Sequence, residues 1–235
     1  MIEILRKNEI SICVYSEKAV TLLQNGNKNK MTYLQFYNQW HPFACFSTQQ
    51  VKAILPEFSR SNYLQWQKSG YIVSLRQGWY AFADYLQKPD YARYFAGQIY
   101  APSYISLHTA LAFYGIIPEA VVEITSVSTQ KTARFENRFG IYSYQTIRQN
   151  LFFGYEAKVM QDGKRYMMAT PEKALVDLLY LYPQYNTESD MLELRLDEDW
   201  MADEMNRERL NAYMEQIGSP ALRRRVTTLL KAYGL

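Results

Sequence analysis

Residues 47–82 read STQQVKAILPEFSRSNYLQWQKSGYIVSLRQGWYAF, and the spacing of apolar residues changes within this stretch. Ser47, with Gln50 three positions later, has the form of a capping box, which begins a helix. Pro56 ends that helix, because proline has no backbone N–H to donate. The side chains that this helix is expected to bury are Val51, Ile54 and Leu55.

A second helix is predicted from Ser59 to Ser69. The Ser59 hydroxyl can cap its first turn, and Tyr63 and Trp66 lie one turn apart on its apolar side. Gly70 follows, at the position where helices end in a left-handed backbone that favours glycine.

After the second helix, the apolar period becomes that of a strand. Residues 71–75 and 79–82 are rich in β-branched and aromatic side chains and flank Arg76-Gln-Gly78. This pattern predicts a short β-hairpin, in which Gly78 takes the positive φ of the turn.

Thr32, upstream, can cap a further short helix that carries Tyr33, Phe36, Tyr37 and Trp40. Three helices followed by a hairpin within about 50 residues is the order of a winged helix-turn-helix. We therefore predict a winged helix-turn-helix DNA-binding domain at residues 31–86, preceded by an N-terminal extension at residues 1–30.

Residues 87–235 mix strand and helix patterns. Ser106 can cap a helix, residues 121–127 and 140–144 alternate like strands, and Asp162-Gly163 is a strong hairpin signal. Thr170-Pro171 begins another helix well, and residues 188–232 contain two or three more, divided at Gly218-Ser-Pro220. The predicted class is α+β: the winged helix, then a mixed α/β domain with a C-terminal helical region.

The composition is that of a cytoplasmic globular protein. The chain has 235 residues with 48% hydrophobic residues, and no apolar run reaches the roughly 18 residues of a membrane span. The first residues lack the apolar segment of a signal peptide, and only Cys13 and Cys45 could form a disulfide. We expect a reducing compartment and no membrane partner.

Charge is unevenly distributed along the chain. Residues 1–183 hold 19 basic and 13 acidic residues, whereas residues 184–216 hold three basic and ten acidic residues. The last segment, residues 217–235, holds four basic residues and no acidic residue. A basic front favours nucleic-acid binding, and the acidic segment indicates a separate role.

In a winged helix, the helix that precedes the hairpin enters the major groove of double-stranded DNA. Here that helix is the one predicted from Ser59 to Ser69. Arginine reads guanine, and asparagine or glutamine reads adenine, while serine and lysine hold phosphates. The hairpin tip reaches the DNA backbone or minor groove. The predicted DNA-binding residues are Ser59, Arg60, Ser61, Asn62, Gln65, Lys68, Arg76 and Gln77. A polar face that meets only water, or that binds a protein, is the alternative.

Trp66 and Tyr80 are expected to be buried between this helix and the hairpin. Base stacking by Trp66 and Trp79 is the weaker alternative.

Catalytic and metal sites have little support in the sequence. His41, His108 and the two cysteines have no ligand spacing, so we expect no metal and no cofactor. A metal-dependent nuclease needs carboxylates to hold its metal and a lysine near the phosphodiester. Such pairs occur at Asp162-Gly-Lys164 and at Glu172-Lys173. A turn and compensation of the helix dipole explain these residues better, so we expect no enzyme.

Four ordered segments between about residues 40 and 180 resemble the AbiEi family of antitoxins and transcriptional repressors. They are Phe46–Val51 with Gly70–Tyr80, Tyr104–Glu119, Ile124–Thr129 with Arg134-Phe135 and Gly140–Tyr144, and Ala169–Leu178. The resemblance does not cover the first 30 residues or the acidic segment.

The resemblance implies an antitoxin that represses its own operon through its N-terminal domain. It also implies that the larger domain antagonises a toxin with a nucleotidyltransferase fold, without a tight complex being required. Tyr142, Tyr144 and Tyr155 would suit a protein or RNA surface there. The alternatives are a winged-helix regulator without a toxin, a protein–protein adaptor and a nucleic-acid-processing enzyme.

Overall fold

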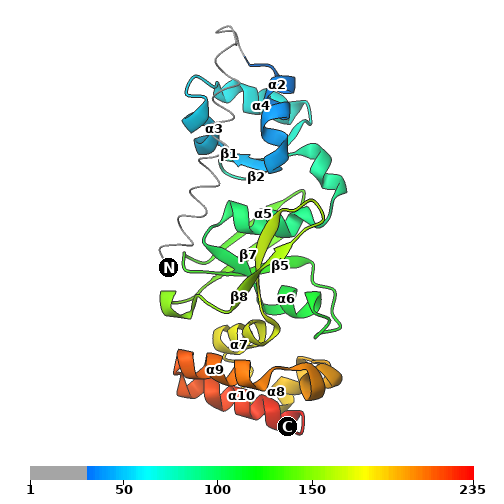
Figure 1. Cartoon of the computed structure of the whole chain (residues 1–235), viewed down its shortest axis with the longest axis vertical. Coiled ribbons are helices and arrows are strands. Elements are labelled where there is room, and N and C mark those ends of the chain that lie inside the picture. The colour runs from blue at the N-terminus through cyan, green and yellow to red at the C-terminus, as the bar shows by residue number, and fades with distance from the viewer. Residues whose placement is uncertain (1–30) are drawn as a thin grey trace. The chain divides into compact units, whose positions relative to one another are not determined.

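The computed structural model describes residues 31–235, so the predicted extension at residues 1–30 lies outside the described part of the chain. The described part of the chain divides between Gln87 and Lys88 into two compact units (Figure 1). Each unit contains both helices and a β-sheet, so the protein has a mixed α+β fold, as predicted.

The N-terminal unit places three helices around a three-stranded antiparallel sheet of order β1-β3-β2. Its elements in chain order are α2 (Tyr33–Trp40), β1 (Cys45–Ser47), α3 (Thr48–Ile54), α4 (Arg60–Lys68), β2 (Ile72–Arg76) and β3 (Trp79–Phe82). A short 3-10 helix at His41–Phe43 precedes β1, and another at Ala83–Gln87 follows β3 at the end of the unit.

Local hydrogen bonds begin these helices at the predicted residues. Thr32 and Ser47 each form a capping box, and the Ser59 hydroxyl accepts from the Ser61 backbone N–H. Gly78 has φ 76° at the β2–β3 turn, a conformation that costs glycine little. The capping and hairpin predictions for this segment are confirmed.

The core of the N-terminal unit is aromatic, and Phe36 lies at its centre. The Phe36 ring is fully buried against the rings of Phe46, Trp66 and Phe82. Trp66 is buried as predicted, but the aromatic rings that contact it belong to Tyr33, Phe36 and Phe58. Two of these rings belong to α2, and α4 also packs against strand β2 of the hairpin.

Tyr80 is only partly buried, so the prediction that it is buried is wrong. Its ring stacks on that of Tyr63 with 5.2 Å between centroids and 6° between planes. Tyr63 and Tyr80 thus form part of the contact between α4 and the hairpin, and tyrosines suit a position with one apolar side and one solvent-exposed side.

The C-terminal unit is built on a six-stranded mixed sheet of order β6-β7-β5-β4-β9-β8. Its strands are β4 (Ser103–Ile105), β5 (Glu123–Ser128), β6 (Ala133–Asn137), β7 (Gly140–Thr146), β8 (Tyr155–Val159) and β9 (Arg165–Ala169). β5 pairs with β7 and β4 with β9 in parallel, and the other pairs are antiparallel.

Helices cover both faces of this sheet, with α5 on one face and α7 on the other (Figure 1). Helices α9 and α10 pack on α7, and the short helix α8 packs on α10. The helices are α5 (Tyr91–Ile99), α6 (Leu107–Phe113), α7 (Pro171–Leu181), α8 (Glu188–Glu193), α9 (Arg207–Ile217) and α10 (Pro220–Ala232). A 3-10 turn at Gln149–Leu151 and a π-helical turn at Trp200–Glu204 complete the unit.

Alternation along β7 turns Tyr142 and Tyr144 inward toward α5, and both are fully buried. The Tyr144 hydroxyl donates to the Ala96 carbonyl of α5 at 2.8 Å. Their expected place on a contact surface is wrong, because aromatic residues at alternate positions here form the core. Tyr155 is 36% exposed.

Ser106 precedes α6 but makes no capping hydrogen bond, which corrects the sequence prediction. Its hydroxyl donates instead to Asp177 of α7 at 2.8 Å. Thr170 does cap α7 as predicted, by accepting from the Lys173 backbone N–H. No helix in residues 31–235 combines the length and apolar character that crossing a bilayer needs.

Candidate functional site

The outer face of α4 is polar and lies open to solvent. Its exposed polar residues are Ser59, Arg60, Ser61, Gln65 and Lys68, and the apolar Leu64 is also 55% exposed. The Ser59 and Ser61 hydroxyls lie 2.7 Å apart at the start of the helix, where backbone N–H groups favour an anion. This face agrees with the predicted one at every position except Asn62.

Asn62 is only 6% exposed, so its predicted place on the solvent face of α4 is wrong. It lies one turn before Trp66 and next to Tyr63, and these three residues form the buried side of the helix. A side chain on that side cannot reach a base edge while α4 keeps its packing.

The β2–β3 turn exposes Gln77 to solvent and Arg76 in part. The backbone N–H of Thr48 donates to the Gly78 carbonyl at 2.8 Å, which ties the turn to the start of α3. A bulge between Ser74 and Arg76 interrupts the strand pairing just before the tip.

The charge balance of this region is modestly positive. Residues 31–87 contain the basic residues Lys52, Arg60, Lys68 and Arg76 and the acidic residues Glu57 and Asp84. Asp84 already accepts from Tyr37 at 3.1 Å and lies 2.6 Å from the His41 Nε2 atom. Because α4 itself carries no acidic residue, its outer face can approach a polyanion.

A buried ionic cluster occupies the centre of the C-terminal unit. The Lys173 side chain is completely buried and forms an ion pair with Asp177 one turn later on α7. Tyr104 of β4 donates to Asp177 at 2.9 Å and accepts from the Lys173 ammonium at 2.8 Å, and Ser106 donates to the same carboxylate. Burial raises the pKa of Asp177, and the Lys173 charge acts against this. The sequence reasoning missed this cluster, although a Lys–Asp pair four residues apart on an apolar helix is a usable signal.

Protein groups already engage the carboxylates that a nuclease would need. Glu172 is 3% exposed and accepts from the Asn206 backbone at 3.0 Å and from Arg209 at 3.3 Å. Asp162 accepts hydrogen bonds from Lys164 and Tyr91; burial raises the pKa of this carboxyl, but these hydrogen bonds together lower it to about 2. Among residues 31–235, no three His, Cys, Asp or Glu side chains are grouped to hold a metal ion.

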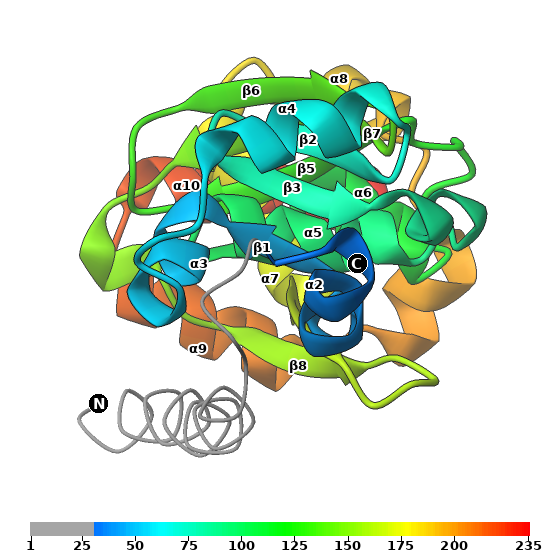
Figure 2. The ribbon, with the colours of Figure 1, turned by 90° about the horizontal axis from the view of Figure 1, so that it is seen from above.

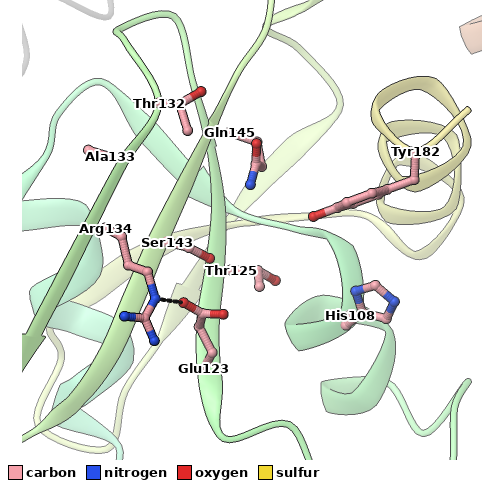
Figure 3. Close-up of a pocket in the computed structure, with 9 residues that line it drawn as sticks. All are labelled: His108, Glu123, Thr125, Thr132, Ala133, Arg134, Ser143, Gln145 and Tyr182. Atoms are coloured by element: carbon pink, nitrogen blue, oxygen red, sulfur yellow. Dashed lines mark hydrogen bonds and ion pairs between the residues drawn. The ribbon is translucent and has the colours of Figure 1, made fainter.

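A polar pocket of about 430 Å³ lies on the sheet face that carries α6 (Figure 3). Glu123 of β5 and Arg134 of β6 form an ion pair of 3.0 Å on one side of it. Its full lining is His108, Glu123, Thr125, Thr132, Ala133, Arg134, Ser143, Gln145 and Tyr182. An adjoining hollow of about 330 Å³ shares His108, Glu123 and Thr125.

The side chains of Ser143, Gln145 and Tyr182 form no hydrogen bond with another residue of the described chain. Figure 3 shows the Tyr182 hydroxyl directed toward Gln145, with His108 below the Tyr182 ring. Burial lowers the pKa of His108, and nearby Glu119 partly opposes this. With Glu123 and Arg134 paired, the pocket presents mainly neutral hydrogen-bonding groups to solvent.

Comparison with models of known protein families and with curated proteins found no match to this chain. The resemblance to AbiEi antitoxins therefore stays a prediction from the quoted sequence segments.

Proposed function

We propose that residues 31–86 form a winged helix-turn-helix that binds double-stranded operator DNA and represses transcription in the cytoplasm. The observation that carries the proposal is the outer face of α4, which is exposed, polar except for Leu64, and free of acidic residues. The order helix, strand, helix, helix, hairpin supports it, because this order presents the helix before the hairpin to the major groove.

The proposed roles follow side-chain chemistry. Arg60 and Gln65 contact base edges, because guanidinium and amide groups form paired hydrogen bonds with guanine and adenine. Ser59, Ser61 and Lys68 contact phosphates, and Arg76 and Gln77 contact the backbone or minor groove. Asn62 is excluded from this set and supports α4 from its buried side.

We propose further that the C-terminal unit antagonises a toxin with a nucleotidyltransferase fold. The support is the resemblance of Tyr104–Glu119 and Ala169–Leu178 to AbiEi antitoxins. A regulator without a toxin partner is the alternative, and a neighbouring reading frame for such a toxin separates the two.

Gel-shift titration with the DNA upstream of the gene tests the first proposal. Replacing Arg60 and Gln65 by Ala should weaken specific binding by about 1–3 kcal/mol for each lost base contact. Asn38→Ala, an exposed amide on α2, is the control and should bind normally. Wild-type affinity in the double variant would show that α4 does not read the operator.

Replacing Lys68 or Arg76 by Ala should have a different effect. Each should weaken binding to all DNA sequences about equally and reduce the dependence of binding on salt, because phosphate contacts release counterions. A loss confined to the operator would contradict the assigned phosphate roles.

A further inference from the structure

Strand β8 forms one edge of the six-stranded sheet and carries apolar side chains in solvent. Val159 is 65% exposed and Tyr155 36%, Ala157 between them is exposed, and Met167 on neighbouring β9 is 41% exposed. Figure 2 shows β8 and β6 at opposite sides of the unit, as the strand order requires. An edge with exposed apolar residues is a template for pairing with another strand.

The hydrogen bonds to β9 fix which backbone groups of β8 point outward. Met160 donates to the Lys164 carbonyl at 2.8 Å, and the Gly154 carbonyl accepts from Thr170 at 2.9 Å. Because backbone groups alternate along a strand, residues 154, 156, 158 and 160 face β9. The N–H and C=O groups of Tyr155, Ala157 and Val159 therefore point away from the sheet.

One antiparallel register makes β8 complementary to itself. Placing Ala157 opposite Ala157 of a second copy pairs Tyr155 with Val159 through the outward backbone groups, and Glu156 then faces Lys158. The Glu156 and Lys158 positions are non-hydrogen-bonded pairs, in which side chains lie closest. Glu156 and Lys158 already form an ion pair of 2.6 Å within one chain, and the first register adds the same pair between chains. The two neighbouring registers would instead oppose Glu156 to Glu156 or Lys158 to Lys158, so charge favours the first one.

The opposite edge of the sheet lacks exposed apolar side chains of this kind. The exposed residues of β6 are Arg134 and Glu136, and Arg134 is held by Glu123 at 3.0 Å. Phe135 packs inward on Tyr100 and Tyr144. Charged side chains are a common protection of an edge strand, which leaves β8 as the edge suited to pairing.

We propose that a second copy of this chain pairs with β8 in antiparallel orientation about a two-fold axis through Ala157, making a symmetric dimer with a continuous sheet. Both copies contribute the same surface, as a two-fold interface requires. A single strand pair is a small interface, so the dimer forms in a concentration-dependent way.

Sedimentation equilibrium of the full chain, from about 1 µM to about 1 mM, tests the proposal. Wild-type protein should show a monomer–dimer equilibrium. Glu156→Lys and Lys158→Glu should each raise the dissociation constant about tenfold or more, because each opposes like charges twice across the axis. The double variant Glu156→Lys/Lys158→Glu should restore dimerisation, and an equimolar mixture of the two single variants should form heterodimers.

Glu136→Lys, a matched charge reversal on the opposite edge, should leave the dimer unchanged, and circular dichroism should show every variant folded. A monomer throughout the concentration range overturns the proposal. So does a dimer that is insensitive to both single reversals, or one that Glu136→Lys alone disrupts. Capture of a different protein by β8 without self-association would likewise overturn it.

Discussion

Lys173 carries a completely buried charge, so its ammonium group needs hydrogen-bond partners from the surrounding protein. A fully buried ammonium group loses its hydration, and only close partners compensate for that loss. Asp177 and Tyr104 supply those partners, and Ser106 donates a further hydrogen bond to the same carboxylate. The Asp177 carboxylate thus connects α7 to Tyr104 of β4 and to Ser106, the residue that precedes α6.

Removing one member of the pair should therefore be severe. We expect Lys173→Ala and Asp177→Ala each to lower the free energy of unfolding by about 3–5 kcal/mol, because each leaves the other charge buried without its partner. The double variant Lys173→Met/Asp177→Leu should lose less than the sum of the single changes. Urea unfolding followed by circular dichroism measures this. Additive losses would contradict the coupling.

His108 should titrate below its ordinary pKa of about 6.5, because burial disfavours the imidazolium form. A His whose pKa is lowered by folding makes the fold less stable as pH falls below 6.5. NMR titration of the imidazole protons measures the shift, with His41→Gln to assign the signals. Glu119→Gln should lower the His108 pKa further, since Glu119 favours the charged ring. An unshifted His108 would contradict its burial in the pocket wall.

At this scale, sequence reasoning succeeded where both partners are local. Thr32, Ser47, Ser59 and Thr170 cap helices by bonding to backbone groups two or three residues ahead, so spacing alone identifies them. Ser106 failed because its hydroxyl bonds to Asp177, a residue far along the chain. The same reason hid the buried cluster, whose members come from separate segments.

Two glycines at the ends of the β8–β9 hairpin allow a test at the scale of elements. Gly154 and Gly163 both have positive φ, of 72° and 82°. A Cβ atom on Gly163 would meet open space, whereas one on Gly154 would lie 2.9 Å from the Lys173 Cγ atom and 3.1 Å from the Tyr213 ring. Backbone strain is thus common to both positions, and overpacking is specific to Gly154.

We expect Gly163→Ala to lower the free energy of unfolding by about 1–2 kcal/mol through backbone strain alone. Gly154→Ala should cost about 1–3 kcal/mol more, because the buried Lys173 stem cannot move aside without disturbing its ion pair. Thermal unfolding of the two variants gives the comparison. Equal losses of stability in the two variants would show that the Lys173 side chain moves aside without cost.

The elements predicted best are those with strong local patterns. The hairpins at Gly78 and Gly163 and the helix starting at Pro171 lie where the sequence places them. The sequence did not predict β4 because three residues are too few to show a period. It did not predict β6 because Phe135 is the only large apolar residue of that strand and lies between the charged Arg134 and Glu136. Sheet order depends on the parallel pairing of β4 with β9, which no local pattern encodes.

Across the whole molecule, the uneven charge of the sequence is partly balanced within the C-terminal unit. Lys231 of basic α10 lies 2.5 Å from Glu188 of α8, and Arg195 lies 3.2 Å from Glu119. These pairs are exposed and contribute little to stability. The acidic segment is thus part of a packed helical layer, and its net charge would repel DNA from that layer.

Each unit has its own hydrophobic core, so we expect residues 88–235 to fold without the N-terminal unit. On the proposed division of labour, this fragment should not bind operator DNA but should relieve growth arrest caused by the cognate nucleotidyltransferase-fold toxin. Residues 1–87 should bind DNA weakly and give no protection.

The full chain with Arg60→Ala and Gln65→Ala is the matched control, and it should lose repression while keeping protection. Co-expression of each form with the toxin provides the readout. Protection by the N-terminal fragment, or none by a folded C-terminal fragment, would refute the division, because the two activities would then not belong to separate units.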